Sequence, residues 1–335
     1  MQALQLDAIH QPAAVREVPT PTPAAGEILV KLHAAALNHR DVWIQKGQYA
    51  GIKLPCTLGA DGAGEVAAHG PEVPAGAPAV GTRVLVYPGL RWGSEQRAQA
   101  KDFVVLGMPD PGTFAEYITM PAHCIHPMPA HLNFEQGAAL PLGGLTAYRA
   151  AFVRAQVQAG ERVLVNGVGG GVALLAAQFC MAHGAEVWVT TGSDEKLARA
   201  LEMGVKGGIN YKAENWVKTL TQQAGGPFDV IIDSAAGEAF NSLVDAAAPG
   251  GRIVFYGGTL GNIPSLVPGK VFWKQLSILG SSMGSEQDFA AMLQFVTENG
   301  IVPVVDEVLP LAEGEAALRR LEASKQFGKV VLKIV

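Results

Sequence analysis

Residues 161–212 read ERVLVNGVGGGVALLAAQFCMAHGAEVWVTTGSDEKLARALEMGVKGGINYK. An apolar, β-branched run from Arg162 to Asn166 enters a glycine-rich loop. An apolar helical pattern follows from Val172 to His183, and a second apolar strand begins at Glu186. Strand, glycine-rich turn, helix and strand in this order are typical of a dinucleotide-binding βαβ unit.

The loop itself holds Gly167, Gly169, Gly170 and Gly171. Glycine lets the backbone approach a pyrophosphate without a Cβ in the way, and the amides at the start of the helix then face the anion. An ordinary tight turn between a strand and a helix would not need so many glycines. We therefore expect these four residues, with Val172 at the start of the helix, to bind a dinucleotide.

The end of the second strand indicates which dinucleotide is bound. A site for the non-phosphorylated cofactor has Asp or Glu about 20 residues beyond the glycines, to bind the ribose 2′-hydroxyl. Here Thr191 and Ser193 occupy that region, the first acid is Asp194, and Lys196 follows. Hydroxyls beside a cation suit a 2′-phosphate, so we expect NADPH. Ser193 and Asp194 could also cap a helix with Lys196 in solvent, and the two interpretations are compatible.

Composition excludes several classes of function. A length of 335 residues suits one large domain or two moderate ones, and 49% hydrophobic residues can form a substantial core. The net charge is −5 and the chain has no basic block, which argues against nucleic-acid or anionic-membrane partners. A small-molecule substrate is the partner that we expect.

The cysteines and the apolar runs indicate where the protein works. Cys56, Cys124 and Cys180 are scattered, which argues for a reducing compartment and against a disulfide framework. The first residues lack the pattern of a signal peptide, and no run of about 18 apolar residues suggests a membrane span. We expect a cytoplasmic protein.

Two different sequence patterns divide the chain into two parts. Short alternating strands at 27–34, 63–69, 83–87 and 112–120, separated by Gly and Pro, predict a β-barrel-like domain. From about Phe134, helical and strand patterns alternate, beginning with a helical pattern over 136–155, and this predicts an open α/β domain with a parallel sheet. We expect the apolar strand at 329–335 to rejoin the first domain.

Several blocks of sequence carry a family resemblance. They are GEILVKLHAAALNHRDVWIQKGQY (26–49), GADGAGEV (59–66), GTFAEY (112–117), the βαβ unit, and FGKVVL (327–332). With these blocks the chain resembles the medium-chain dehydrogenase/reductase superfamily over essentially its whole length. The resemblance implies an α/β protein with a GroES-like β-rich catalytic domain (1–123 and 268–335), a doubly wound Rossmann domain (124–267) that binds NADPH, and an active site between them.

The positions of the family's catalytic zinc ligands depart from the zinc-dependent pattern. Asn38 stands where those members have a cysteine, Ala60 and Asp61 replace the last two residues of their GHE motif, and Leu142 occupies the third ligand position. Zinc needs several nitrogen, sulfur or oxygen ligands. We therefore expect no catalytic zinc.

Other metal sites have equally little support in the sequence. The loop 88–107, which corresponds to the family's structural-zinc lobe, keeps its length but contains no cysteine. His123 and His126 flank Cys124, yet no second cluster of ligands in the sequence completes a site. The sequence therefore predicts a protein without a bound metal.

Without zinc, the chain resembles the quinone oxidoreductase branch, which includes zeta-crystallin-like NADPH enzymes. Asn38, Asp41 and Tyr49 match that branch, and the loop Gly167-x-x-Gly170-x-x-Ala173 fits its phosphate-binding motif with small-residue exchanges. Trp43 stands where the branch often has Tyr, and the retained lobe is longer than in compact members. Beyond the loop, the resemblance implies cofactor contacts at Thr146, Thr191, Ser193, Lys196, Tyr211, Gly257 and Lys329.

This resemblance favours reduction of a quinone or an α,β-unsaturated carbonyl compound. Hydride addition to a conjugated acceptor places charge on a distant oxygen, which a hydrogen-bond donor can stabilise without a metal. We expect Tyr49 to be that donor, Asn38 to orient the substrate or the nicotinamide carboxamide, and Asp41 to hold the loop. The alternatives are a surface tyrosine at a turn for Tyr49 and a turn or cap residue for Asn38.

Two other functions and two assemblies stay open. The chain could be a zinc-type alcohol dehydrogenase-like protein, or a non-enzymatic NADPH-binding sensor. An uncovered edge strand at 276–280, with the apolar segment 260–271 beside it, favours a homodimer joined sheet to sheet. The lobe at 88–107 could instead support a tetramer.

Overall fold

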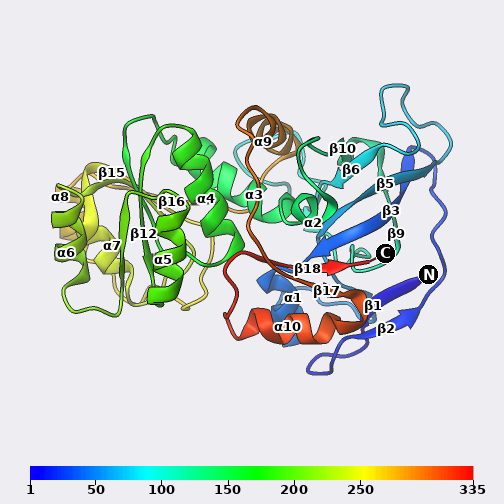
Figure 1. Ribbon diagram of the computed structural model, residues 1–335, viewed down its shortest axis with the longest axis horizontal. Helices are drawn as coiled ribbons and strands as arrows, with labels where there is room; N and C mark the ends of the chain where they lie inside the picture. Colours follow the sequence, from blue (N-terminus) through cyan, green and yellow to red (C-terminus); the bar gives the residue numbers. More distant parts are fainter. Residues whose placement is uncertain (335) are drawn as a thin grey trace. The chain divides into compact units, whose positions relative to one another are not determined.

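The computed structural model describes residues 1–334 and divides into two compact units. Unit 1 comprises Met1–Leu145 and the segment from Gly284 onward, and unit 2 comprises Thr146–Met283. Figure 1 shows a unit rich in strands and a unit in which helices flank a sheet. This architecture confirms the expected α/β fold with a GroES-like part and a Rossmann part.

Unit 1 is built around a mostly antiparallel sheet in the order β10-β6-β5-β3-β18-β17, and β9 also pairs with β3. Its strands are β1 (Gln2–Leu6), β2 (Ala14–Glu17), β3 (Glu27–Ala36), β4 (Cys56–Thr57), β5 (Asp61–His69), β6 (Arg83–Val86), β7 (Gly89–Leu90), β8 (Val104–Val105), β9 (Tyr117–Pro121), β10 (Ile125–Pro127), β17 (Val305–Pro310) and β18 (Lys329–Lys333). Its helical segments are α1 (His39–Gln45), η1 (Ala122–Cys124), α2 (Phe134–Ala138), α3 (Pro141–Tyr148, which crosses the unit boundary), α9 (Glu286–Glu298), η3 (Leu311–Glu313) and α10 (Gly314–Glu322).

The alternating pattern of β3 explains its central place in unit 1. Every second side chain from Ile28 is buried, as expected for a strand that covers a core with one face. β18 pairs with the end of β3 in antiparallel register, with Val331 opposite Ala36. The last strand therefore rejoins the first part of the chain, as the sequence predicts.

The lobe at 88–107 is held together by side chains. β7 and β8 form a short antiparallel pair within it. Trp92 is 2% exposed, packs edge-on against Phe103 at 5.2 Å between ring centroids, and donates a hydrogen bond from Nε1 to Glu95 O. A buried tryptophan thus supplies packing and a hydrogen bond inside the lobe.

Unit 2 contains a parallel sheet in the order β13-β12-β11-β14-β15-β16. Figure 1 shows α4 and α5 on one face of this sheet and α6 and α7 on the other. Its strands are β11 (Arg162–Val165), β12 (Glu186–Thr191), β13 (Gly207–Asn210), β14 (Phe228–Asp233), β15 (Ala247–Phe255) and β16 (Ser277–Gly280). Its helices are η2 (Arg149–Arg154), α4 (Gly171–Ala182), α5 (Asp194–Glu202), α6 (Trp216–Gln223), α7 (Phe240–Ala246) and α8 (Pro268–Trp273).

The strand order of unit 2 fixes where a ligand can bind. β11 has β12 on one side and β14 on the other, so the direction of winding reverses there. In open parallel sheets, ligands bind beyond the carboxyl ends of the strands at such a reversal. The glycine-rich loop follows β11 and therefore lies at this position.

The structure places the domain boundaries differently from the expected ones. Residues 124–145 belong to unit 1, because β10 pairs with β6 of that unit. Residues 268–283 belong to unit 2, because β16 pairs with β15 in the parallel sheet. The helical pattern at 136–155 is also divided into α2, α3 and η2, with Pro141 at the start of α3.

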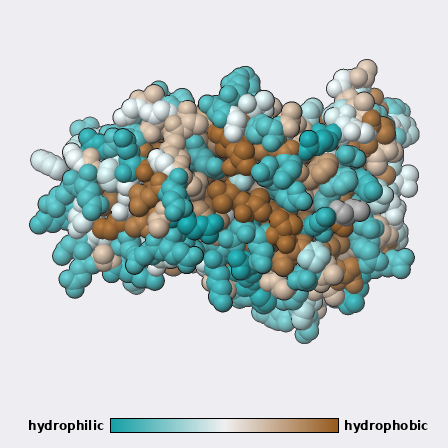
Figure 2. All heavy atoms as spheres, viewed as in Figure 1, coloured by the Kyte–Doolittle hydropathy of each residue, from teal (hydrophilic) through white to brown (hydrophobic). Residues whose placement is uncertain are grey.

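The surface of the described residues carries polar and apolar regions. Polar side chains cover much of the face in Figure 2, with apolar side chains gathered in patches. Every helix within residues 1–334 is too short or too polar to cross a lipid bilayer.

Candidate functional site

The glycine-rich loop of unit 2 has the conformation that its sequence predicts. Gly167 and Gly169 have φ angles of +76° and +142°, which L side chains rarely adopt. Gly170 is the N-cap of α4, and a Cβ built on it would meet no atom within 4 Å. Open space thus lies against the backbone at the start of α4, where helix amides favour an anion.

A hydrogen-bonded brace fixes this loop to three strands. Asn166 accepts a hydrogen bond from Thr190 Oγ1 at the end of β12 and donates one to Asp233 Oδ1 at the end of β14. The same Thr190 hydroxyl accepts from Gly167 N at 3.0 Å. Since Asn166 itself follows β11, the three carboxyl ends are tied together beneath the loop. The sequence analysis did not single out these bracing residues.

Lys196 and Tyr211 lie at the same end of the sheet. A Cβ on Gly169 would stand 3.0 Å from Lys196 Cδ and 3.4 Å from its Nζ, so the lysine side chain runs against the glycine-rich loop. A Cβ on Gly192 would stand 2.5 Å from the Tyr211 hydroxyl. Glycines at both positions make room for a cation and a phenol at the carboxyl end of β12.

The remaining expected cofactor positions of this region differ in their exposure. Ser193 is the N-cap of α5 and accepts a hydrogen bond from Lys196 N at 3.4 Å, while Asp194 accepts one from Asn210 Nδ2. The capping interpretation of Ser193 is therefore realised in the structure. Thr191 is only 2% exposed, so its side chain has little surface to offer a ligand. Gly171 and Val172 open α4, whereas Thr146 lies on α3, 6% exposed.

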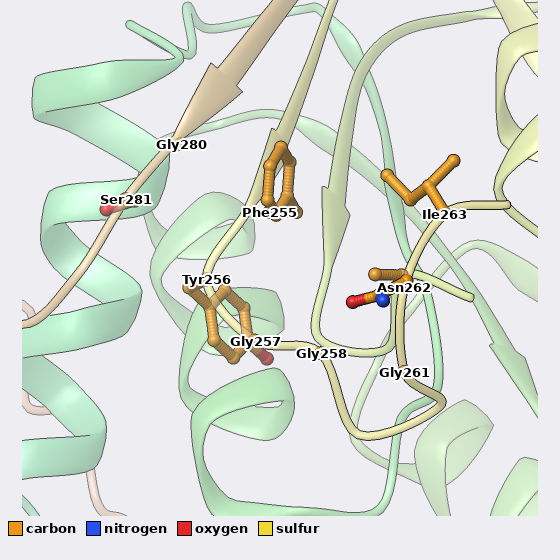
Figure 3. A pocket seen from close by; sticks show the side chains of 10 residues that line it. Phe255, Tyr256, Gly257, Gly258, Gly261, Asn262, Ile263, Gly280 and Ser281 are labelled. Carbon is orange, nitrogen blue, oxygen red and sulfur yellow. The ribbon is translucent and has the colours of Figure 1, made fainter. Parts of the chain in front are cut away.

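A pocket of about 440 Å³ lies beyond the ends of β14, β15 and β16, and it includes Gly257. A Cβ on Gly257 would stand 2.6 Å from Ser234 O, so only glycine permits this close approach of two backbones. Figure 3 shows Phe255 and Tyr256 on one side of the pocket and Asn262 and Ile263 on the other. Gly257 is among the residues predicted from the sequence, but these side chains are not, because Phe255 ends β15 and the others lie in loops without a recognisable motif.

In unit 1, a buried network joins Asn38, Asp61 and Lys329. The Lys329 ammonium donates hydrogen bonds to Leu37 O (2.7 Å), Asn38 Oδ1 (2.7 Å) and Asp61 Oδ2 (2.9 Å). Asn38 Nδ2 donates to the same Asp61 oxygen at 2.9 Å. The other Asp61 oxygen accepts from Leu142 N at 2.7 Å. Lys329 and Asp61 are 5% and 0% exposed, so the charges neutralise each other away from water.

This network changes the role expected for Lys329. The sequence analysis assigned it to the cofactor, but all three ammonium hydrogens are taken by acceptors of unit 1. Asp61, which the sequence places only at the last position of the GHE motif, accepts from three partners.

A catalytic zinc ion does not fit these residues. The oxygens of Asn38 and Asp61 already surround an ammonium group, and Ala60 and Leu142 offer no nitrogen, sulfur or oxygen side-chain ligand. Binding zinc would require Lys329 to leave and its buried partners to lose their hydrogen bonds. The site instead holds a fixed positive charge supplied by the chain itself.

Tyr49 and Arg40 form a second group in unit 1. The Arg40 guanidinium lies 5.0 Å from the centre of the Tyr49 ring, and its Nε donates to the Tyr49 hydroxyl at 3.4 Å. The other Arg40 nitrogens donate to Val105 O, Leu106 O and Met108 O, so this buried arginine fastens the end of the lobe. Within residues 1–334, Arg40 is the hydrogen-bonding partner of the Tyr49 hydroxyl, which leaves the phenol proton for another acceptor.

Asp41 and His39 flank Arg40 on α1. Asp41 is fully buried and accepts a hydrogen bond from Asn38 N at 2.8 Å, which fixes the start of the helix. Burial raises the pKa of Asp41 to about 6, although the charge of Arg40 and the Asn38 N–H act in the opposite direction. Burial and, secondarily, the charge of Lys329 lower the pKa of His39, so its ring is neutral at pH 7. The sequence analysis did not assign His39 a role at the site.

Comparison with known proteins agrees with this architecture. Residues 24–130 match the family model of the alcohol dehydrogenase GroES-like domain, and residues 171–298 match that of zinc-binding dehydrogenases. The chain is similar to the zinc-type alcohol dehydrogenase-like protein YogA of Leptosphaeria maculans, with 34% identity over 97% of this chain and 96% of the relative. It is also similar to the quinone oxidoreductase of Mus musculus, with 33% identity over 94% of this chain and 92% of the relative.

Among solved structures, an NAD-dependent alcohol dehydrogenase matches with a TM-score of 0.95 and 38% identity over 100% of both chains. Fold, nucleotide-binding loop and relatives together define a nicotinamide-dependent oxidoreductase. The chain belongs to the medium-chain dehydrogenase/reductase superfamily.

Proposed function

We propose that this protein is an NADPH-dependent oxidoreductase that reduces a quinone or an α,β-unsaturated carbonyl compound without a catalytic zinc ion. The observation that carries the proposal is the Lys329 ammonium, which donates hydrogen bonds to Asn38, at one of the family's metal-ligand positions, and to Asp61, which follows another. Reduction of an unactivated ketone benefits from a Lewis acid, whereas a conjugated acceptor places its developing charge on an oxygen that hydrogen bonds can stabilise.

The side chains at the end of β12 favour NADPH over NADH. Lys196 lies against the glycine-rich loop, and Tyr211 lies against Gly192. A cation and a phenol hydroxyl together match the charge and the acceptor oxygens of a 2′-phosphate. Asp194, the first acid beyond β12, accepts a hydrogen bond from Asn210 Nδ2. When bound, the nicotinamide ring supplies the hydride.

Three groups of unit 1 serve the substrate in this proposal. Tyr49 donates its phenol proton to the substrate oxygen as negative charge develops there, while Arg40, which lies over the ring and donates to the hydroxyl, holds Tyr49 in place. Asn38, held at both ends of its carboxamide, orients the ligand through the remaining lone pair of Oδ1. Asp41 keeps the start of α1 in place.

A second candidate is an alcohol dehydrogenase that uses NAD. The solved structure at 38% identity is named as an NAD-dependent alcohol dehydrogenase, and one relative is named as zinc-type. Oxidation of saturated alcohols with NAD would favour this candidate. Tight cofactor binding without turnover of any substrate would instead favour a sensor.

The test is a substrate panel on the metal-depleted protein. Quinones, enones and saturated aldehydes are offered with NADPH or NADH, and saturated alcohols with the oxidised cofactors. Turnover is followed by cofactor absorbance. The proposal expects quinone or enone reduction with NADPH that survives removal of zinc by a chelator.

A further inference from the structure

A cluster of possible metal ligands lies in unit 1, made of residues that belong neither to the Asn38 network nor to the lobe at 88–107. His123 and Cys124 belong to η1, and Glu286 is the first residue of α9. The ligand atoms of these three side chains all lie within 4.8 Å of one another, and His123 Nε2 is 3.4 Å from Glu286 Oε1. Within residues 1–334, no other group of three such side chains meets this condition.

We propose that His123, Cys124 and Glu286 bind a divalent transition-metal ion, with Zn²⁺ as the ion of choice. One nitrogen, one sulfur and one oxygen form the mixed set that zinc accepts, and a thiolate excludes Mg²⁺ and Ca²⁺. Tetrahedral zinc places such ligand atoms about 3.3–3.6 Å apart. The three ligand atoms therefore need to approach one another by at most about 1.5 Å.

The surrounding structure brings the two segments together before any ion binds. Tyr87 N donates to Cys124 O, and the Tyr87 hydroxyl donates to Gly284 O, both at 2.8 Å. One residue thus fastens η1 and the loop that precedes α9. Phe289, fully buried on α9, packs against Tyr87 with ring centroids 5.4 Å apart. A preformed pair of segments lowers the ordering cost of metal binding.

Glu286 is also available as a ligand, although it stands at a helix start. Ser285 caps α9 by accepting from Asp288 N at 3.1 Å, and Asp288 accepts from Ser285 N at 3.0 Å. This reciprocal pair satisfies the helix terminus without the Glu286 carboxylate.

The ligand charges and a neighbouring cavity bear on the same occupant, while Cys124 itself is fully buried, and burial together with the charge of Glu286 raises the pKa of its thiol to about 12. The carboxylate and the thiolate together neutralise a divalent cation, and the thiol proton leaves to solvent when the metal–sulfur bond forms. His123 and Glu286 line a cavity of about 790 Å³ together with Trp92 and Met120. Three protein ligands leave a fourth position for water.

The experiment uses the full chain after removal of metal by a chelator. Co²⁺ is titrated first, because a thiolate ligand gives a near-ultraviolet charge-transfer band, and Zn²⁺ affinity is then measured by competition with a chromophoric chelator. We expect one ion per chain and the thiolate band in the wild type. Cys124→Ser should abolish the band.

Substitutions of the two exposed ligand side chains test metal binding without disturbing the folding of the protein. His123 and Glu286 side chains are 61% and 43% exposed, so His123→Asn and Glu286→Gln should fold normally. Each should weaken Zn²⁺ binding by at least about 100-fold, since even loss of a group behind a ligand typically costs 10- to 100-fold. Glu298→Gln, at the other end of α9, is the matched control and should bind as the wild type does.

Three outcomes would overturn the proposal. They are no stoichiometric ion, a bound ion without the thiolate band, and an affinity that is unchanged in Glu286→Gln. NADPH-dependent turnover, measured in parallel, should be unchanged in all variants. The metal test therefore succeeds or fails independently of the proposed reaction.

Discussion

Lys196 is the residue on which the choice between the two cofactors depends. Its side chain runs along the glycine-rich loop, with the ammonium near Gly169, at the end of the strand where a 2′-phosphate is expected. Its helix start is also capped by Ser193, which fixes the backbone from which it extends. An ammonium group held in this way strengthens the binding of a cofactor only when that cofactor carries the 2′-phosphate.

Lys196→Ala should weaken NADPH binding by one to two orders of magnitude, about 1.4 to 2.8 kcal/mol, and barely change NADH binding. Calorimetric or fluorescence titration of both cofactors measures the effect. Lys206→Ala is the control, because Lys206 precedes β13 at the opposite end of the strands. Equal wild-type affinities for NADPH and NADH would contradict the assignment.

Tyr49 tests the assigned chemistry at the substrate. Tyr49→Phe removes the phenol proton but leaves the ring over Arg40, and loss of one preorganised donor typically costs about 10²–10³ in rate. The long 3.4 Å contact to Arg40 indicates a loosely held hydroxyl, so we expect a fall in kcat/KM of about 10- to 100-fold. Tyr117→Phe, on β9, serves as the control. Unchanged kcat/KM for every accepted substrate would remove Tyr49 from the mechanism.

Neighbouring site residues could be predicted from the sequence more easily than residues that are far apart along the chain. The sequence predicts that Gly167, Gly169 and Lys196 lie together, because they belong to one βαβ unit, and Lys196 does lie against Gly169. The sequence analysis assigned Lys329 to the cofactor and gave Asp61 no role, although the two residues form an ion pair. They are 268 positions apart, so only the pairing of β18 with β3 shows that they meet.

At the level of elements, the loop between β11 and α4 is the proposed cofactor site. Two of its glycines are required for different reasons. Gly169 has a positive φ that other residues rarely adopt, whereas Gly170 has an ordinary φ of −81° and open space where a Cβ would lie. The first requirement belongs to the fold of the loop. For Gly170 we propose that a bound ligand occupies the space where a Cβ would lie.

Gly170→Ala should therefore weaken cofactor binding by at least about tenfold, or about 1.4 kcal/mol, while the midpoint of thermal unfolding changes little. Gly169→Ala should lower that midpoint as well, because alanine is strained at its φ. Thermal unfolding without cofactor and cofactor titration separate the two effects. If Gly170→Ala binds the cofactor as tightly as the wild type, the cofactor does not occupy the space beside residue 170.

Elements with strong local patterns could be predicted, and elements defined by partners could not. The runs RVLV of β11 and EVWVTT of β12 are apolar and β-branched, and both are strands. β13, with the sequence GGIN, has no such pattern and becomes a strand because it pairs with β12. The two compact units have other bounds than the expected domains for the same reason, since pairing decides to which unit β10 and β16 belong.

For the whole molecule, β16 at the edge of the parallel sheet favours a homodimer. The neighbouring α8 leaves Phe272 and Trp273 69% and 83% exposed, and Leu260 is 66% exposed. Edge strands with unpaired backbone groups tend to find a partner, and a large exposed apolar patch marks an interface. Two copies related by a twofold axis would cover both features.

Light scattering should therefore give a mass near twice the 35.0 kDa of one chain. The double substitution Phe272→Asp with Trp273→Asp should shift the protein to a single chain, because charge at the patch opposes its burial. Val80→Asp, at a residue 64% exposed in unit 1, is the control and should leave the mass unchanged. A wild type that is already monomeric would contradict this assembly.

The most direct test of the account is the rate of NADPH-dependent reduction of quinones and enones by protein depleted of metal. We predict turnover of at least one conjugated acceptor, with the same kcat/KM before and after zinc is removed, because Lys329 rather than zinc occupies the site of Asn38 and Asp61. Efficient oxidation of saturated alcohols that is lost on chelation and restored by zinc, without turnover of any quinone or enone, would contradict it.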